Sequence, residues 1–243
     1  MKNNLSNSFT DYFRHAFNIL MSQHLDNFDE LFAIDPKHYF HMCPDEKTII
    51  VSATYYRLND VEDPPINYIV RLKLVDGELK IDSIIEFKAS EELDRSLHVY
   101  SMCSSYHGKH IALGLPNLKN GAVIIYNNEN IATELYNPSN VNSLFGYDIA
   151  ASDCFSRIVI TAPMKDNKGI VYIYDKDDKS NIYRVITTVA IEGMSLFGIE
   201  VTLNDTGNYC SIKTGNIKLN MNRDIYNKEW KYTNSDKVTV INY

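Results

Sequence analysis

The sequence repeats itself, and this repetition constrains the fold more than any other feature. Ser143–Gly146 reads Ser-Leu-Phe-Gly, and the same four residue types recur at Ser195–Gly198. Beyond each glycine the chain continues with alternating apolar residues, so that Ile149 is matched by Val201. A chain with internal copies of this kind folds into similar supersecondary units that stack on one another.

Two more pairs of segments match between neighbouring copies. His110–Pro116 corresponds to Arg157–Pro163, and both are apolar runs that end in proline. Asn120–Tyr126 corresponds to Lys168–Tyr174, and in both a glycine precedes a run that ends in tyrosine. Fainter copies lie towards either end of the chain, at Thr48–Ala53 with Tyr68–Leu72 and at Tyr209–Ile212 with Gly215–Leu219.

Each copy follows one plan of four strands. The first strand starts at Leu-Phe-Gly, the second is the most apolar, and the third follows the glycine. The fourth strand is more polar and is predicted at Glu78–Phe87, Asn130–Tyr136, Asn181–Val189 and Asp224–Tyr232. The 17 Tyr and 10 Phe of the chain agree with many strands and disfavour a bundle of helices.

Four antiparallel strands in roughly 50 residues are the unit of a β-propeller blade. We therefore predict an all-β fold, a small β-propeller of about four four-stranded blades preceded by an α-helix. The helical segment is expected over residues 1–35, followed by a repeat domain over 36–243 with units of about 36–90, 91–139, 140–190 and 191–243.

The N-terminal helix is predicted over residues 8–23, where apolar side chains recur at spacings of three and four residues. In one interpretation its apolar face packs on the propeller. In the other, Phe13, Phe17 and Leu20 bind a protein partner, as an amphipathic helix does in a groove.

The repeats resemble the FG-GAP repeat, which is the blade unit of integrin α-type propellers. Phe145-Gly146 and Phe197-Gly198 are similar to its Phe-Gly element, and Thr161–Pro163 is similar to its Gly-Ala-Pro element with Thr in place of Gly. The resemblance is strongest over residues 143–174. It implies a structural role within each repeat for Leu144, Phe145, Gly146, Pro163, Gly169, Leu196, Phe197 and Gly198.

Propellers of this family usually have seven blades, whereas four units fit this chain. A closed ring, an open arc and an assembly of two chains are all compatible with the sequence. The last strand, Lys237–Tyr243, is a candidate to pair with an early strand and close the ring, which would remove an exposed sheet edge.

The family often binds calcium in an aspartate-rich hairpin loop. The equivalent turns here are Ser105–Gly108, Asp153–Ser156 and Asp205–Gly207. None of them offers the set of oxygen ligands that a calcium ion needs, so no calcium site is predicted.

Two groups of potential zinc ligands are close in sequence: His38, His41 and Cys43, and Cys103, His107 and His110. Neither group contains the paired Cys-x-x-Cys arrangement that is typical of zinc sites. We therefore predict no metal site and no other cofactor.

Catalytic signatures are absent from the sequence, which has no nucleophile elbow, phosphate-binding loop or dinucleotide fingerprint. No catalytic residue is predicted. The 24 Lys and Arg residues are outnumbered by 31 Asp and Glu residues, and no basic run exists, which disfavours binding to nucleic acid or to an anionic membrane.

The sequence also predicts a location. No apolar stretch is long enough to span a membrane, the N-terminus lacks the features of a signal peptide, and the four cysteines are far apart. We expect a cytoplasmic protein or a virion component with free thiols.

The sequence favours a non-catalytic interaction or structural module with protein partners, self-association included. The expected setting is a larger assembly such as a virus particle. The alternatives are a carbohydrate-active or other hydrolytic enzyme on a propeller fold, and a receptor domain that binds a glycan or a protein.

Overall fold

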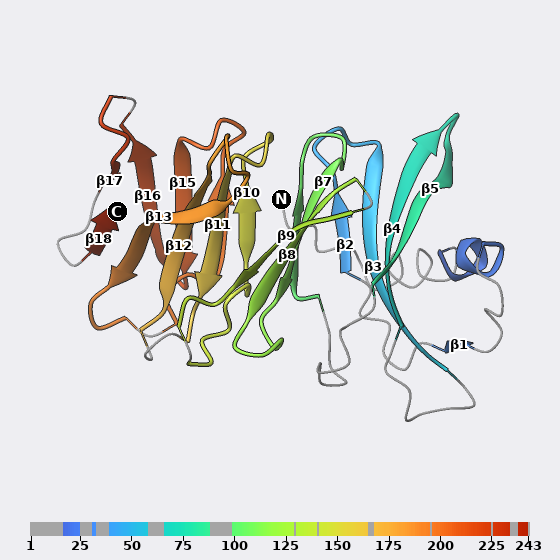
Figure 1. Ribbon diagram of the computed structural model, residues 1–243, viewed down its shortest axis with the longest axis horizontal. Coiled ribbons are helices and arrows are strands. Elements are labelled where there is room, and N and C mark those ends of the chain that lie inside the picture. The colour runs from blue at the N-terminus through green and yellow to red at the C-terminus, as the bar shows by residue number, and fades with distance from the viewer. Residues whose placement is uncertain are drawn as a thin grey trace.

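In the part of the chain that the structure describes, four antiparallel β-sheets follow one another along the sequence and lie in a row (Figure 1). This computed structural model describes residues 17–24, 31–32, 39–57, 66–87, 99–128, 130–139, 141–164, 168–194, 196–224, 226–233 and 238–242. The predicted all-β, propeller-like fold of four blades is confirmed by these sheets.

Each sheet contains a meander of four consecutive strands. The first sheet holds β2 (Tyr39–Met42), β3 (Thr48–Arg57), β4 (Ile66–Val75) and β5 (Glu78–Phe87), with β1 (Leu31–Phe32) paired to the end of β3. The second sheet holds β6 (Ser101–Ser104), β7 (His110–Leu115), β8 (Ala122–Asn127) and β9 (Asn130–Tyr136).

The last two sheets repeat this order. The third sheet holds β10 (Ile149–Ala151), β11 (Arg157–Ala162), β12 (Ile170–Lys176) and β13 (Tyr183–Ile191), with β18 (Val238–Asn242) as a fifth strand. The fourth sheet holds β14 (Glu200–Leu203), β15 (Tyr209–Thr214), β16 (Ile217–Arg223) and β17 (Trp230–Thr233).

The sheets pack face to face, and a separate apolar core fills the space between each neighbouring pair. Ile50 of the first sheet shares a core with Leu113 of the second. Ile125 of the second sheet shares one with Ile160 of the third, and Val159 of the third shares one with Ile212 of the fourth. Because both of its faces are covered, every residue of β11 is buried.

A short helix, residues 17–22, covers the outer face of the first sheet at the right-hand end of Figure 1. Phe17 and Met21 are buried there against a core that includes Tyr55 and Val70, and Leu20 is half-buried beside them. Phe17, a predicted partner-binding residue, is thus covered by the chain's own first sheet. Phe13 lies outside the described residues, so partner binding through it stays a prediction.

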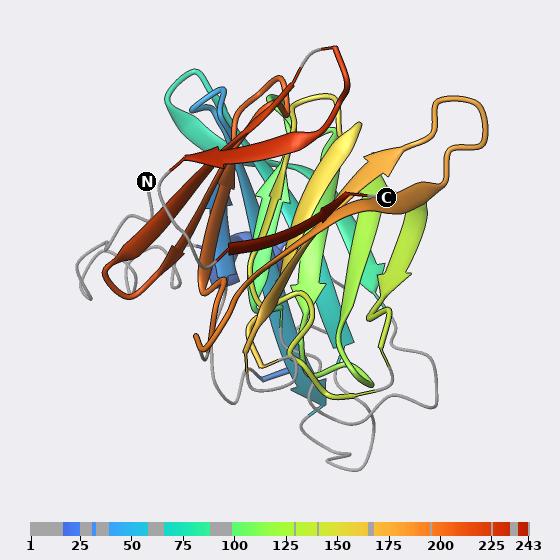
Figure 2. The same ribbon diagram turned by 90° about the vertical axis from the view of Figure 1, so that its left-hand side faces the viewer.

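The last strand does not close a ring. The prediction that Lys237–Tyr243 pairs with an early strand is wrong, because β18 pairs antiparallel with β13, from Thr187↔Asn242 to Ile191↔Val238. Figure 2, which looks onto the left-hand end of the molecule, shows β18 lying along β13 after the chain has left the fourth sheet. The first and fourth sheets lie at opposite ends of the row (Figure 1).

The turn between the first two strands has one geometry in all four described sheets. In each turn a backbone N–H donates to the carbonyl three residues earlier, and the donor residue has a left-handed φ. The donors are Glu46 (φ 56°), Gly108 (66°), Phe155 (54°) and Gly207 (73°). The repeat alignment made the last three of these turns equivalent.

Arginine side chains connect these turns to the preceding sheet. Nη1 of Arg71 donates to the Gly108 carbonyl of the next sheet at 3.2 Å, and Nη1 of Arg157 donates to the Gly207 carbonyl. Arg157 also forms an ion pair with Asp175, whose second oxygen accepts a hydrogen bond from Arg223 of the fourth sheet at 3.0 Å. The arginines therefore satisfy turn carbonyls across sheet boundaries.

No helix among the described residues is long and apolar enough to cross a membrane.

His41 of β2 contacts the second sheet, where its Nε2 lies 2.9 Å from Oγ of Ser104 in β6. Burial lowers the pKa of His41 to about 4, so the ring is neutral in the folded protein at neutral pH. The unfolded chain takes up a proton near the ordinary histidine pKa of about 6.5. Stability is therefore lost as the pH falls from about 6.5 towards 4.

We predict that this histidine makes a measurable contribution to acid sensitivity. Between pH 7 and pH 5, the wild type should lose about 2 kcal/mol more unfolding free energy than His41→Gln, at about 1.4 kcal/mol per pH unit. Urea denaturation at the two pH values measures both slopes. Equal losses in the two proteins would contradict the assignment of a neutral, buried His41.

Candidate functional site

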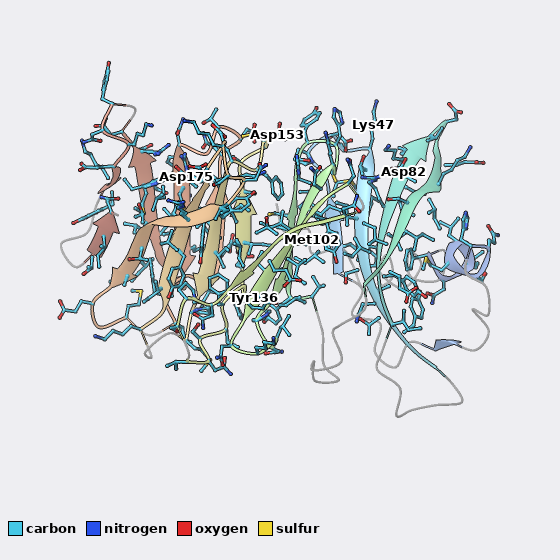
Figure 3. The ribbon with its side chains drawn as sticks, viewed as in Figure 1. Lys47, Asp82, Met102, Tyr136, Asp153 and Asp175 are labelled. Atoms are coloured by element: carbon cyan, nitrogen blue, oxygen red, sulfur yellow. The ribbon has the colours of Figure 1, made fainter. Side chains whose placement is uncertain are left out.

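The loops of the molecule divide into two faces because every sheet is an up-and-down meander. The turn face, uppermost in Figure 1, carries the turns at 43–48, 105–110, 152–157 and 204–209. The connection face, on the lower side, carries the links between sheets and the loops between second and third strands, at 116–121, 136–147, 163–169, 192–199 and 214–217. In Figure 3, Lys47 and Asp153 lie at the turn face and Tyr136 at the connection face.

The predicted motif residues come together on the connection face, at the start of the third and fourth sheets. Phe145 and Phe197 are fully buried, each against the loop of the preceding sheet. Gly121 forms a bridge with Phe145, and a Cβ atom on Gly121 would lie 2.5 Å from the Phe145 carbonyl oxygen. On Gly169 a Cβ atom would lie 2.4 Å from the Phe197 carbonyl oxygen. Backbone thus packs directly on backbone at each boundary.

Backbone hydrogen bonds join the loops of this face to one another. The N–H of Asn137 donates to the Gly121 carbonyl at 3.1 Å, and that of Met164 donates to the Ser143 carbonyl at 3.1 Å. The N–H of Phe197 donates to the Lys168 carbonyl at 3.2 Å, and that of Gly198 donates to Oγ1 of Thr214 at 2.8 Å. Among the described residues, hydrogen bonds thus link the loops of this face in the last three sheets.

Apolar side chains stand out from the connection face. Leu196 is 47% exposed although its neighbour Phe197 is buried, and its φ of 58° separates the directions of the two side chains. Leu144 has the same φ sign and is half-buried, while Gly146, Pro163, Gly169 and Gly198 are buried. The exposed apolar side chains of the face are Tyr100, Tyr136, Val141, Met164, Leu196, Ile199 and Ile217, each 37–53% exposed.

Charge separates the two faces. Among its described residues, the connection face has the exposed charged side chains Lys119, Glu134, Lys168 and Glu192, with Lys213 and Lys218 flanking its 214–217 loop. Glu134 accepts a hydrogen bond from the Tyr136 hydroxyl at 2.6 Å. On the turn face the exposed charged side chains are Glu46, Lys47, Asp76, Glu78, Lys109, Asp153, Asp177, Asp178, Lys179, Asp205, Lys228 and Glu229. Apolar side chains such as Tyr106 and Tyr226 are also exposed there, but they stand among these charges.

Two tyrosines stack at the inner edge of the connection face, where the second and third sheets begin. The rings of Tyr100 and Tyr147 have centroids 4.6 Å apart, and their hydroxyl groups are 3.2 Å apart. The hydrogen bond with Tyr100 raises the pKa of Tyr147 to about 12, so the Tyr147 hydroxyl adds no charge to the face at neutral pH.

A shallow hollow of about 290 Å³ lies at the rim of the same face, in the second sheet. Lys119 and Tyr136 form its wall, with Nζ of Lys119 5.6 Å from the centre of the Tyr136 ring. Asn137 lines the hollow, but its amide already donates to Asn120, Val141 and Ser143. The polar groups of the hollow are thus mostly used within the chain.

The candidate zinc ligands are not brought together. In the described ranges no three His, Cys, Asp or Glu side chains are grouped for metal binding. Cys43 contacts Ser104, His107 pairs with Asp45 at 3.2 Å, and the ring of His110 stacks 5.3 Å from that of Phe155. The side chains of Cys43, His107 and His110 thus make contacts between neighbouring sheets instead. His38 lies outside the described residues.

Sequence comparison gives no family: no protein-family model matches the chain, and no curated protein matches it. Solved structures share its fold. A candidate 6-phosphogluconolactonase from Bacteroides fragilis matches with a TM-score of 0.52 and 14% identity, over 86% of this chain and 59% of its own. A second from Bacteroides uniformis matches with a TM-score of 0.51 and 13% identity, over 85% and 58%.

A third structure, the Cps50 (Swd1) β-propeller domain of Myceliophteria thermophila, matches with a TM-score of 0.45 and 9% identity, over 82% of this chain and 73% of that domain. The two Bacteroides structures show a shared fold at an identity too low to transfer function. The chain spans somewhat less than three fifths of their length.

The backbone contact at Gly169 gives a stability prediction with a matched control. Gly169 and Gly77 have nearly equal φ angles of 80° and 84°, but a Cβ on Gly77 would meet nothing within 4 Å. Gly77→Ala should therefore cost only the left-handed backbone strain, about 1 kcal/mol. Gly169→Ala should cost about 2–3 kcal/mol more, because the fourth sheet must move away. Denaturant midpoints measure both, and similar losses would contradict a tight contact at Gly169.

Proposed function

We propose that this protein is a non-catalytic interaction module that binds a protein partner on its connection face. The observation that carries the proposal is the set of seven exposed apolar side chains on the connection face, whose described residues expose fewer charges than those of the turn face. Exposed apolar surface marks binding sites when its side chains gather, and the centres of protein interfaces are depleted of charge and enriched in Tyr and Met.

The connection face needs little ordering before it binds. Its described loops are held by hydrogen bonds within the sheet units and, at Phe197 and Lys168, between two sheets, so few of these groups lose freedom when a partner docks. A protein surface is the partner that fits best, because a nucleic acid would need the clustered positive charge that Lys119 and Lys168 alone do not provide.

A relation of the repeats to FG-GAP repeats is part of this proposal, and its ground is the sequence resemblance at Phe145-Gly146 and Phe197-Gly198. A place in a larger assembly, such as a virus particle, is proposed as the setting of the partner.

The proposal predicts where a partner contacts the chain. A photoactivatable cross-linking residue at Leu196 should give one discrete protein adduct in the native host cell. The same residue at Tyr226, which is 90% exposed on the turn face, should give little or none. Equal adducts from both positions would contradict the proposal.

Charge insertion gives the quantitative arm of the test. The double variant Met164→Lys with Leu196→Lys should weaken partner binding at least tenfold, while Tyr226→Lys should leave it unchanged. All three side chains are exposed, so each variant should unfold within about 0.5 kcal/mol of the wild type. Undiminished binding by the double variant would exclude this face.

A hydrolytic enzyme is the second candidate function. Two solved structures with the same fold are described as candidate 6-phosphogluconolactonases. If this chain shares that activity, it should hydrolyse 6-phosphogluconolactone well above the spontaneous rate. If the purified chain hydrolyses this lactone, and mutation of residues of the chain abolishes the hydrolysis, the result would favour a hydrolytic enzyme over an interaction module.

A further inference from the structure

The outward face of the fourth sheet, at the left-hand end of the row, differs chemically from the same face of the second and third sheets. The strand register makes the positions comparable. In the third sheet Val159 pairs with Ile173, in the second Ala112 pairs with Ile125, and in the fourth Ser211 pairs with Asn220. A second row of pairs joins Thr161 to Val171, Gly114 to Val123 and Lys213 to Lys218.

In the inner sheets this face is apolar and covered by the next sheet. Val159, Val171 and Ile173 are all fully buried in the core shared with the fourth sheet. Ala112, Val123 and Ile125 are buried in the same way against the third sheet.

In the fourth sheet the equivalent positions are polar. Ser211 replaces Val159, Lys218 replaces Val171 and Asn220 replaces Ile173. Lys213, Lys218 and the adjacent Thr202 are exposed, whereas Ser211 is buried and Asn220 is half-buried. Lys213 forms an ion pair with Glu200 at 3.6 Å. Another apolar sheet stacked here would bury Lys218 together with this ion pair, and burial of charge away from water is strongly unfavourable.

At the opposite end of the row, a helix of the chain itself covers the outer face of the first sheet. The helix at residues 17–22 lies on the first sheet, where Phe17 is 1% and Met21 0% exposed. The fourth sheet of a second copy could reach that face only by displacing this helix.

The last strand supports the same conclusion. β18 follows the fourth sheet along the chain but pairs with β13 of the third. Oδ1 of Asn242 accepts from Oγ1 of Thr187 at 2.9 Å and faces the N–H of Trp230 in β17 at 3.4 Å. The strand that might have bridged to the first sheet is thus used to tie the fourth sheet to the third (Figure 2).

We infer that the outward face of the fourth sheet is a terminal, solvent-facing cap, and that the four sheets form an open arc. Neither the first sheet of the same chain nor a second copy of the chain stacks on this face. A repeat array needs such polar end faces to stay soluble, since each inner repeat exposes an apolar face when its neighbour is absent.

The test places the apolar residues of the third sheet at the equivalent positions of the fourth sheet. The triple variant Ser211→Val, Lys218→Val, Asn220→Ile takes its side chains from the third sheet and should self-associate at micromolar concentrations. The wild type should not associate through this face, and the control variant Ser211→Thr, Lys218→Arg, Asn220→Gln should behave like the wild type. Light scattering after size-exclusion chromatography measures all three.

Amine labelling of the wild-type protein is a second test of the inference and needs no variant. Lys213 and Lys218 should react with an acetylating reagent at the same rate in dilute and concentrated protein. Concentration-dependent protection of these two lysines would overturn the inference, as would a folded triple variant that stays monomeric. A wild-type oligomer in which both lysines remain fully reactive would support the inference, because its interface then lies elsewhere.

Discussion

The contact between a glycine of one sheet and the first aromatic residue of the next is the constraint on which the rest of the structure depends. At Gly121–Phe145 and Gly169–Phe197 the two backbones approach so closely that no Cβ atom fits. These contacts fix the third sheet against the second and the fourth sheet against the third. The core between the sheets, the alignment of the arginines with the next turn and the outward direction of Leu196 all require this placement of the sheets.

At the boundary between the third and fourth sheets, different interactions hold the two faces. At the connection face the contact of Gly169 with Phe197 is backbone on backbone and uses no charged side chain. At the turn face, Arg157 reaches across to the Gly207 carbonyl, as Arg71 does to Gly108 between the first and second sheets. A boundary that is closed by backbone leaves its side chains free to project, and exposed apolar side chains such as Leu196 suit a protein partner.

The sequence predicted the repeats well where they carry their own markers. Leu-Phe-Gly starts the third and fourth units, and in the second and third sheets a glycine precedes the third strand at a position where no Cβ atom fits. The predicted fourth strands agree with β5 and β9 residue for residue. The connection face was harder to predict: nothing in the order Leu196-Phe197 tells which side chain is buried, since that depends on a left-handed φ at Leu196. The partner of β18 was predicted wrongly because an alternating strand of Val238–Asn242 fits any open edge, and only the path of the chain selects β13.

The return of β18 to the third sheet has a physical reason in an open arc. An inner sheet has two neighbours, whereas the fourth sheet has one, and in a linear array stability is nearly the sum of nearest-neighbour interfaces. The fourth sheet would therefore separate first if its single interface were its only attachment. With β18 paired to β13, its separation also requires the five backbone pairs of that strand to break. β18 therefore helps to hold the fourth sheet, which has a single neighbouring sheet, in its place. The exposed Leu196, Ile199 and Ile217 of the connection face belong to this sheet and keep their positions with it.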